Sequence, residues 1–196
     1  MRSAGESHTM RIVPDSGLLD AARFVSSPNC DLRPEPAEIG LLVIHNISLP
    51  PCEFGGPYIE ALFTNCLDPA AHPFFQEIQG LEVSSHLLIR RDGELVQYVP
   101  FHLRAWHAGQ SCFDGRGRCN DFSIGVELEG ADEVPYEPVQ YSRLVEVTQA
   151  LMRAYPGITR ERIVGHCDIA PGRKTDPGPA FEWARYFDAL GQRLDT

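Results

Sequence analysis

Short apolar runs bounded by turn residues mark the strands of this chain. Leu41-Leu42-Val43-Ile44 has no polar position, which is typical of a strand buried on both faces of a sheet. Residues 122–128 alternate instead, with Phe122, Ile124, Val126 and Leu128 on one face and Ser123, Gly125 and Glu127 on the other. The small side chains of the second face indicate either exposure to solvent or room for a ligand above the sheet.

The other periodic segments are a hairpin and several helices. Residues 84–90 and 94–99 flank Arg91-Asp92-Gly93, whose Asp-Gly pair is typical of a hairpin turn. Apolar positions at helical spacing predict a long helix over 138–155 and shorter ones over 57–66 and from Pro179 to about Leu190. Strands mingled with helices predict an α/β fold, a single domain with a central mixed β-sheet flanked by helices.

Composition and charge narrow the classes of function. The 196 residues suit one domain, and we expect a loosely ordered N-terminal segment over 1–20 followed by the domain over 21–196. The formal charge of −10 argues against nucleic-acid and anionic-membrane partners, because both need a basic face. Nothing in the sequence indicates an obligate protein partner.

Two further features favour a cytoplasmic protein. Residues 1–20 contain no apolar run long enough for a signal-peptide core, and no later segment approaches a membrane span. The six cysteines stand at irregular spacings without a CxxC pair, so we expect mostly free thiols in a reducing compartment.

Two histidines follow predicted strands and are candidates for a metal pair. His45 comes directly after Leu41–Ile44, and His166 after Ile163-Val164-Gly165. Strand ends are where open α/β sheets place ligands, and imidazole suits zinc. Asp176 is the best third ligand, because Pro177 holds it on an extended segment. Three protein ligands would leave the fourth zinc position for water.

Other side chains compete for these roles. Cys167 and Asp168 adjoin His166, but adjacent residues of an extended chain point apart and do not readily converge on one ion. His86 lies in a predicted strand, which favours a core or surface role. His102 and His107 remain open as functional groups.

Five segments carry a resemblance that spacing alone does not supply. They contain His45-Asn46, Trp106-His107-Ala108-Gly109, Ile124-Gly125-Val126-Glu127, Gly165-His166-Cys167-Asp168 and Lys174-Thr175-Asp176-Pro177-Gly178. In this order, between about Ser27 and about Tyr186, they resemble the type 2 N-acetylmuramoyl-L-alanine amidases, whose fold is shared with peptidoglycan recognition proteins. Within that family the likeness is to the cytoplasmic amidases of cell-wall recycling.

The resemblance implies an enzyme, its cofactor and its substrate. One zinc ion per chain would be held by His45, His166 and Asp176. The substrate would be an anhydro-muropeptide, cut between the lactyl group of 1,6-anhydro-N-acetylmuramic acid and L-Ala. Glu127 would serve as general base and acid, with Glu129 on the same strand face as the alternative. Lys174 would stabilise the oxyanion.

Substrate contacts follow less directly from the resemblance. Asn46 adjoins a ligand and is a candidate for binding the peptide backbone. Trp106 is a candidate for stacking on the sugar or lining the groove, with a buried anchor as the alternative. Arg118, with Arg116, is a candidate clamp for stem-peptide carboxylates, since guanidinium meets carboxylate in a two-pronged fit.

A different class of function shares the same fold. Some peptidoglycan recognition proteins have lost zinc and only bind cell-wall fragments, so a non-catalytic binding protein is the main alternative. That alternative requires a missing ligand, whereas His45, His166, Asp176, Glu127 and Lys174 are all present.

Overall fold

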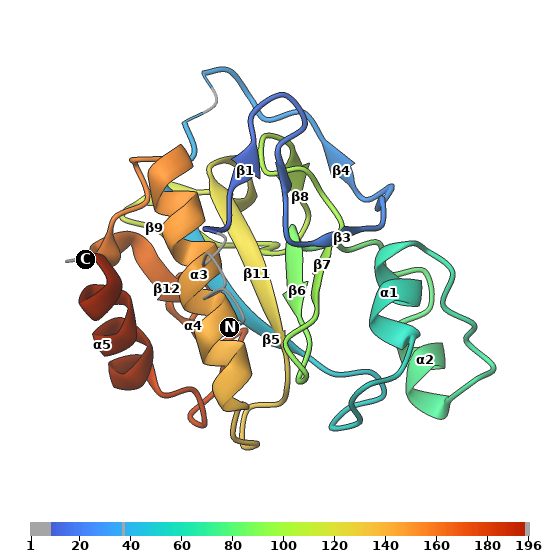
Figure 1. Ribbon diagram of the computed structural model, residues 1–196. Coiled ribbons are helices and arrows are strands. Elements are labelled where there is room, and N and C mark those ends of the chain that lie inside the picture. The colour runs from blue at the N-terminus through green and yellow to red at the C-terminus, as the bar shows by residue number, and fades with distance from the viewer. Residues whose placement is uncertain (1–8, 37, 195–196) are drawn as a thin grey trace, which may run out of the picture.

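A six-stranded mixed sheet forms the centre of the computed structural model, which describes residues 9–36 and 38–194. Its strand order is β12 (Ile163–Gly165), β5 (Leu41–Ile47), β11 (Ser123–Glu129), β6 (Leu87–Ile89), β7 (Leu95–Gln97) and β3 (Arg23–Phe24). The first four strands are parallel, β7 runs antiparallel to β6, and β3 runs parallel to β7. The prediction of an α/β fold with a central mixed sheet flanked by helices is confirmed (Figure 1).

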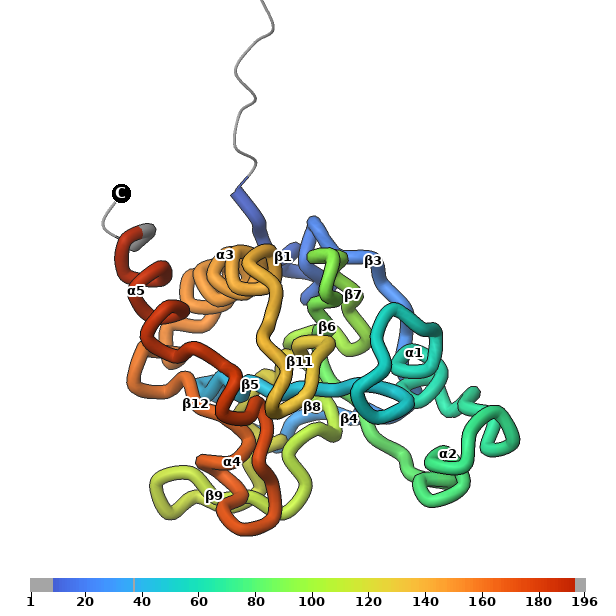
Figure 2. Tube along the Cα trace, turned by 90° about the horizontal axis from the view of Figure 1, so that it is seen from below, coloured from blue at the N-terminus to red at the C-terminus, as the bar shows by residue number. Residues whose placement is uncertain are grey.

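Two long helices cover one face of the sheet. α3 (Pro138–Ala154) and α5 (Trp183–Leu194) lie on the side opposite α4 (His166–Ile169) (Figure 2). The predicted helix over 138–155 is confirmed, and its apolar stripe is buried against alternate residues of the sheet: Leu42 and Ile44 of β5, and Ile124 and Val126 of β11.

α5 begins four residues later than the sequence predicted. In a helix that began at Pro179, the N–H of Trp183 would donate to the Pro179 carbonyl, but it donates to the Phe181 carbonyl at 3.1 Å. The preceding segment is held by contacts with other parts of the chain, since Ala180 donates to the Asp132 carbonyl and Glu182 to the Tyr141 hydroxyl. Helical hydrogen bonding therefore starts only at Trp183.

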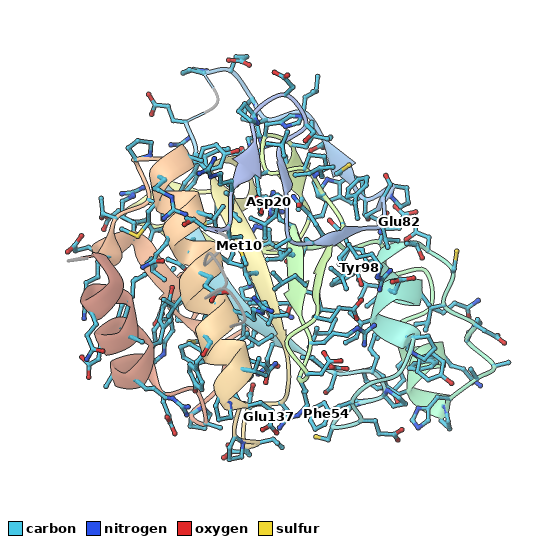
Figure 3. All side chains as sticks on the ribbon, in the orientation of Figure 1. Met10, Asp20, Phe54, Glu82, Tyr98 and Glu137 are labelled. Atoms are coloured by element: carbon cyan, nitrogen blue, oxygen red, sulfur yellow. The ribbon has the colours of Figure 1, made fainter. Side chains whose placement is uncertain are left out.

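The opposite face of the sheet carries smaller elements. α1 (Tyr58–Phe63) and α2 (Pro73–Glu77) pack at the β7 end, where Tyr98 lies between the sheet and α1 (Figure 3) with its ring centroid 5.0 Å from that of Phe63. α1 confirms the helix predicted within 57–66. Short ladders and a 3₁₀ turn complete this face: β4 (Cys30–Asp31) with β8 (Arg104–Ala105), β9 (Cys112–Phe113) with β10 (Arg116–Gly117), and η1 (Cys119–Asp121). A second 3₁₀ turn, η2 (Arg160–Arg162), contacts α5, where Arg160 donates to the Phe187 carbonyl at 3.2 Å.

The predicted hairpin is formed by β6 and β7. Leu88 pairs with Val96, and the turn passes through Gly93 at a φ of +87°. A Cβ at Gly93 would lie 2.6 Å from Cγ2 of Val139 at the start of α3. Only glycine combines this backbone conformation with such a close approach.

Residues 9–20 are more regular than their polar sequence suggested. They contain the hairpin of β1 (Ile12–Val13) and β2 (Leu18–Leu19). Met10 and Leu19 are buried in the core, and Met10 lies beside α3 (Figure 3), where Arg153 donates a 2.9 Å hydrogen bond to its carbonyl. Burial of these two apolar side chains orders the part of the 1–20 segment that the structure describes.

The described helices and cysteines bear on two further expectations. None of the described helices is both long enough and apolar enough to cross a bilayer. All six cysteines lie in the described ranges as free thiols, as expected.

A buried arginine anchors the irregular segment after β4. Arg33 is only 5% exposed, and its guanidinium donates to four carbonyl groups, those of Asn120, Asp121, Phe101 and Ser123. Burial lowers the pKa of Arg33 to about 10, which leaves it charged near neutral pH. One side chain thereby ties the segment after β4 to η1 and to the start of β11.

Replacing Arg33 by Met should destabilise the protein strongly. Four buried carbonyls would lose their donor, at about 1–3 kcal/mol for each one left unsatisfied, so we expect the free energy of unfolding to fall by about 3 kcal/mol or more. Urea denaturation measures this loss. Arg23→Met is the matched control, because Arg23 forms only surface ion pairs with Glu60 and Glu94, which contribute about 1 kcal/mol or less. Equal losses in the two variants would contradict the anchoring role of Arg33.

Candidate active site

Three neighbouring parallel strands deliver the polar groups of the site. β11 pairs with β5 so that Glu127 lies opposite His45, and β12 pairs with β5 so that Gly165 lies opposite Ile44. His166 directly follows Gly165 as the first residue of α4. Residues in register on adjacent parallel strands point to the same face, so the three side chains share the sheet face opposite α3. His45 is inside β5, which continues to Ile47, whereas the sequence placed it just after the strand.

His45, His166 and Asp176 converge to form a candidate metal-binding group. Nδ1 of His45 is 3.0 Å from Nδ1 of His166 and 3.0 Å from Oδ2 of Asp176. Nδ1 of His166 is 3.1 Å from the same carboxylate oxygen. Among the described residues these three form the group of histidine, cysteine and acidic side chains able to share an ion.

The donor set fits a small divalent cation such as zinc. Zinc bonds to nitrogen and oxygen at about 2.0–2.2 Å, so the ligand atoms of a tetrahedral site lie about 3.3 Å apart. The observed 3.0–3.1 Å separations are close to this value. The other ring nitrogen of each histidine has a partner, His107 Nδ1 at 2.9 Å from His45 Nε2 and the Ala108 carbonyl at 3.1 Å from His166 Nε2. Both Nδ1 atoms are therefore available to a metal.

The competing side chains do not join this group. Asp168 instead accepts a 2.7 Å hydrogen bond from the backbone N–H of Gly165, and neither it nor Cys167 belongs to the convergent group. His102 is exposed, at the far side of the β1–β2 hairpin against Gly17. His107, which the sequence left open, has its Nδ1 2.9 Å from Nε2 of His45 and lines the same cavity as the metal-binding group.

A cavity of about 480 Å³ opens onto the metal-binding group. One part of its lining is polar and includes His45, Asn46, Glu127, Asp132, His166, Arg173, Lys174 and Asp176. The other part is apolar and includes Leu62, Phe63, Leu81, Val83 and Trp106. The division into a charged and an apolar part suits a ligand with a reactive polar centre and a bulkier, less polar portion.

Glu127 lies in this cavity as a buried carboxyl group. It is 7% exposed, and its Oε2 has no hydrogen-bond partner among the described residues. Burial raises the pKa of Glu127 well above its ordinary value, the nearby Asp176 charge raises it further, and Lys174 opposes the shift. A carboxyl group held in this way binds a proton more readily than one exposed to solvent.

Glu129, the alternative on the same strand, is engaged in the structure of a different region. Its carboxylate accepts from the backbone N–H groups of Gly55 at 2.6 Å and Arg91 at 3.1 Å, and from the Arg90 guanidinium at 3.4 Å. It lines a separate cavity of about 570 Å³. Arg91, beside it, contacts the Phe54 ring and the Glu137 carboxylate, which lie along one edge of the molecule (Figure 3). Glu129 therefore holds loops together.

Of the three predicted substrate contacts, two line the cavity and one lies outside it. Asn46 lines the cavity, but both hydrogens of its amide are used, toward Asp132 at 2.8 Å and the Pro177 carbonyl at 3.1 Å. It thus steadies the segment that carries Asp176. Trp106 lines the cavity, and its indole N–H is buried without a partner among the described residues. Arg118 lies outside the lining, 78% exposed and ion-paired with Asp121 at 3.2 Å.

Two residues of the site were not singled out from the sequence. Arg173 lines the cavity and donates to the carbonyls of Ala108 and Gln110, both at 2.6 Å. Asp132 lines it too and fixes Asn46. Arg173 adjoins a recognisable motif, but Asp132 lies in a turn whose sequence carries no signal of its position.

Acid should destabilise the metal-free protein through its buried histidines. Burial lowers the pKa of His45 to about 4 and the pKa values of His86 and His107 well below their ordinary range. An unfolded histidine titrates near about 6.5, so below that pH the unfolded chain binds protons that the folded chain does not. This stabilisation is fully present above about pH 6.5 and is lost as the pH falls, by up to about 1.4 kcal/mol per pH unit for each histidine.

Urea denaturation in the presence of a chelator, at a series of pH values between about 7 and about 4, measures this dependence. A free energy of unfolding that stays constant or rises on acidification would contradict it.

Known proteins of this fold carry the same elements. A family model described as N-acetylmuramoyl-L-alanine amidase matches residues 35–179. The 1,6-anhydro-N-acetylmuramyl-L-alanine amidase AmpD of Escherichia coli (strain K12) is 63% identical over 172 residues, covering 88% of this chain and 93% of the relative. A crystal structure of an AmpD derivative superposes with a TM-score of 0.87 at 61% identity, covering 90% of this chain and 97% of that one.

A more distant structure contains a ligand. The complex of the N-acetylmuramyl-L-alanine amidase AmiD from E. coli with the substrate anhydro-N-acetylmuramic acid-L-Ala-D-gamma-Glu-L-Lys has a TM-score of 0.55 at 32% identity, over 80% of this chain and 60% of that one. The family match over residues 35–179 includes every strand of the central sheet except β3, the convergent histidines and aspartate, and Glu127. The chain therefore belongs to the N-acetylmuramoyl-L-alanine amidase family.

Proposed function

We propose that this protein hydrolyses the amide bond between the lactyl group of 1,6-anhydro-N-acetylmuramic acid and L-Ala, with one zinc ion held by His45, His166 and Asp176. The observation that carries the proposal is the buried Glu127 carboxyl group, whose Oε2 has no hydrogen-bond partner in the described part of the chain, in the same cavity as the convergent His-His-Asp group. Its substrate is supported by relatives named 1,6-anhydro-N-acetylmuramyl-L-alanine amidase at 61–63% identity.

The cofactor would supply the activation that an amide requires. Zinc in such a site lowers the pKa of a bound water to about 7 and polarises a carbonyl group. His45, His166 and Asp176 would supply three protein ligands, the number that is typical of a catalytic zinc site. Burial of His45, which lowers its pKa, keeps its ring neutral and able to bind a metal near neutral pH.

Glu127 would move the proton in this reaction. The attacking water must lose a proton and the departing amide nitrogen must gain one, so a single carboxyl group beside both atoms can carry it between them. The raised pKa of Glu127 brings its two protonation states closer in free energy near neutral pH. Register with His45 across β5 and β11 places the carboxyl group next to the metal-binding group.

Lys174 would stabilise the negative charge that develops on the carbonyl oxygen. Its side chain lines the cavity, close enough to Glu127 and His45 to affect the pKa of each. Removal of one such donor typically costs about 2.7–4 kcal/mol of transition-state stabilisation.

Three further residues are proposed to contact the substrate. Trp106 would face the sugar with its ring from the apolar part of the cavity, while its indole N–H is buried. Asn46 has only its amide oxygen left for the peptide backbone, because both of its amide hydrogens are used. Arg118 stands outside the lining, so it would clamp only a stem peptide long enough to extend beyond the cavity.

The same reasoning extends to the setting and to the alternative function. We propose that the protein acts in the cytoplasm, which the six free thiols support, because a reducing compartment keeps thiols unpaired. A non-catalytic binding protein of this fold would lack part of the metal or proton-transfer machinery. The convergence of all three candidate ligands beside Glu127 favours the enzyme.

Cleavage of a defined muropeptide tests the proposal. Mass spectrometry of an anhydro-muramyl tripeptide incubated with the protein should show release of the free tripeptide. A zinc chelator should stop the reaction, and added zinc should restore it. Retained binding without cleavage by zinc-loaded protein would instead support the non-catalytic alternative.

Replacing Glu127 by Gln should separate catalysis from metal binding. The variant should keep its zinc, while turnover falls by about 10²–10⁴-fold because the proton carrier is lost. Glu129→Gln is the matched control, which should lose thermal stability through its loop contacts and retain turnover. Wild-type turnover in Glu127→Gln together with loss in Glu129→Gln would reassign the role to Glu129.

A further inference from the structure

Two adjacent residues contact the Nε2 atoms of both candidate metal histidines. Nε2 of His45 lies 2.9 Å from Nδ1 of His107, and Nε2 of His166 lies 3.1 Å from the carbonyl oxygen of Ala108. The ligands come from β5 and from the start of α4, far apart in the sequence, yet their outer partners are consecutive. One short segment after β8 therefore contacts both rings on the side away from Asp176.

A single buried amide holds this segment in place. The side-chain oxygen of Asn120 accepts the backbone N–H of His107 at 3.2 Å and that of Ala108 at 2.8 Å. Asn120 is 7% exposed, and its own carbonyl accepts from the guanidinium of Arg33 at 3.0 Å. The position of the segment is thus tied to the core and does not depend on the surface loop that follows it.

The sheet leaves a space shaped for the His107 ring. A Cβ built on Gly125 of β11 would lie 2.5 Å from Cγ of His107, so any side chain there would displace the ring. The small residues on this face of β11 make room for a group of the chain itself, which is neither of the two outcomes that the alternation suggested. Ser123, two residues earlier, lies 3.1 Å from Nε2 of His107.

The positions of the hydrogens on His45 and His107 follow from the choice of the ring nitrogen that faces a metal. If Nδ1 of His45 faces a metal, its hydrogen is on Nε2 and is donated to His107. His107 then accepts at Nδ1, carries its own hydrogen on Nε2 and donates it to the Ser123 hydroxyl. His166 likewise carries its hydrogen on Nε2 and donates it to the Ala108 carbonyl.

We propose that His107 and Ala108, held by Asn120, position both metal histidines by fixing their hydrogens on Nε2 and so leaving both Nδ1 atoms for the metal. The inference deepens the proposed function, since it concerns the same metal site. The positioning is needed because Asp176 competes for the hydrogen of the His45 ring when no metal is bound. Its Oδ2 lies 3.0 Å from Nδ1 of His45. Without the acceptor on His107, the hydrogen moves to Nδ1 and the ring no longer offers that nitrogen.

Two variants of His107 with nearly the same shape separate the acceptor from the packing. Asn places an oxygen where Nδ1 of histidine stands, whereas Leu offers a similar volume with no acceptor. We expect His107→Leu to weaken zinc binding by about 10–100-fold, the usual effect of losing an outer partner of a ligand, and His107→Asn to retain most of the affinity. Competition with a chromogenic chelator measures both affinities, and His102→Leu, an exposed histidine remote from the cavity, controls for loss of a histidine.

Nitrogen NMR of the metal-free protein gives a second readout that needs no substrate. In His107→Leu the fraction of His45 with its hydrogen on Nε2 should fall, while that of His166 stays unchanged because the Ala108 carbonyl remains. Asn120→Ala should disturb both histidines and Asn120→Asp, which keeps the acceptor, should disturb them much less. If the Leu and Asn variants of His107 bind zinc equally and leave the hydrogen of His45 in place, the proposal is wrong.

These outcomes are distinct from failure of the proposed reaction. A wild-type protein that binds zinc without cleaving the muropeptide would refute the reaction. The zinc affinities of His107→Leu and His107→Asn would still test the positioning role. A wild-type protein that cleaves in a zinc-dependent way, with equal affinities in the two His107 variants, would refute the positioning role alone.

Discussion

The parallel register of β12, β5 and β11 is the constraint on which the site depends. Hydrogen bonding between these strands sets Glu127 opposite His45 and brings Gly165, with His166 following it, level with Ile44. Because register on parallel strands also fixes the face, a slip of one residue in β11 would turn Glu127 into the α3 core and bring an apolar side chain to the cavity. The apolar residues at alternate positions of β5 and β11 prevent that slip, since they are buried under α3. The core thus determines where the reactive groups stand.

Burial gives those groups their chemical character. Removal from water lowers the pKa values of His45 and His107, which keeps both rings neutral near neutral pH, and raises the pKa of Glu127. The convergent Nδ1 and Oδ2 atoms are potential ligands of a cation, and such a cation would relieve their crowding at 3.0–3.1 Å. The site is therefore arranged for a positive charge that the chain does not itself supply. Lys174 offers one at the rim of the cavity, where a substrate oxygen can reach it.

Much of this arrangement is readable from the sequence, and the rest is lost for identifiable reasons. The strand at Leu41, the β6–β7 hairpin and α3 follow from local periodicity. The convergence of His45, His166 and Asp176 was predicted from positions at strand ends and before a proline, although His45 lies inside β5, which continues to Ile47. Contacts between distant segments leave no local pattern. The burial of Met10 against α3, the use of Asn46 to hold the Pro177 segment and the late start of α5 each depend on such a contact. The alternation of β11 was seen correctly, but its small residues face His107, which is brought over the sheet from another part of the chain.

Glu127 and Glu129 show how far the surroundings, and not the residue type, decide a role. Both are carboxyl groups on one strand and on one face, two positions apart, and both are almost fully buried. Glu129 receives two backbone N–H groups and a guanidinium, so its charge is fully used in joining the loop at Gly55 to the β6–β7 hairpin. Glu127 has an oxygen without a partner, a neighbouring carboxylate that opposes its ionisation and an opening toward solvent through the cavity. Burial without a full set of partners raises the pKa of Glu127 above its ordinary value, and this difference in surroundings favours Glu127 over Glu129 as the proton carrier of the proposed reaction.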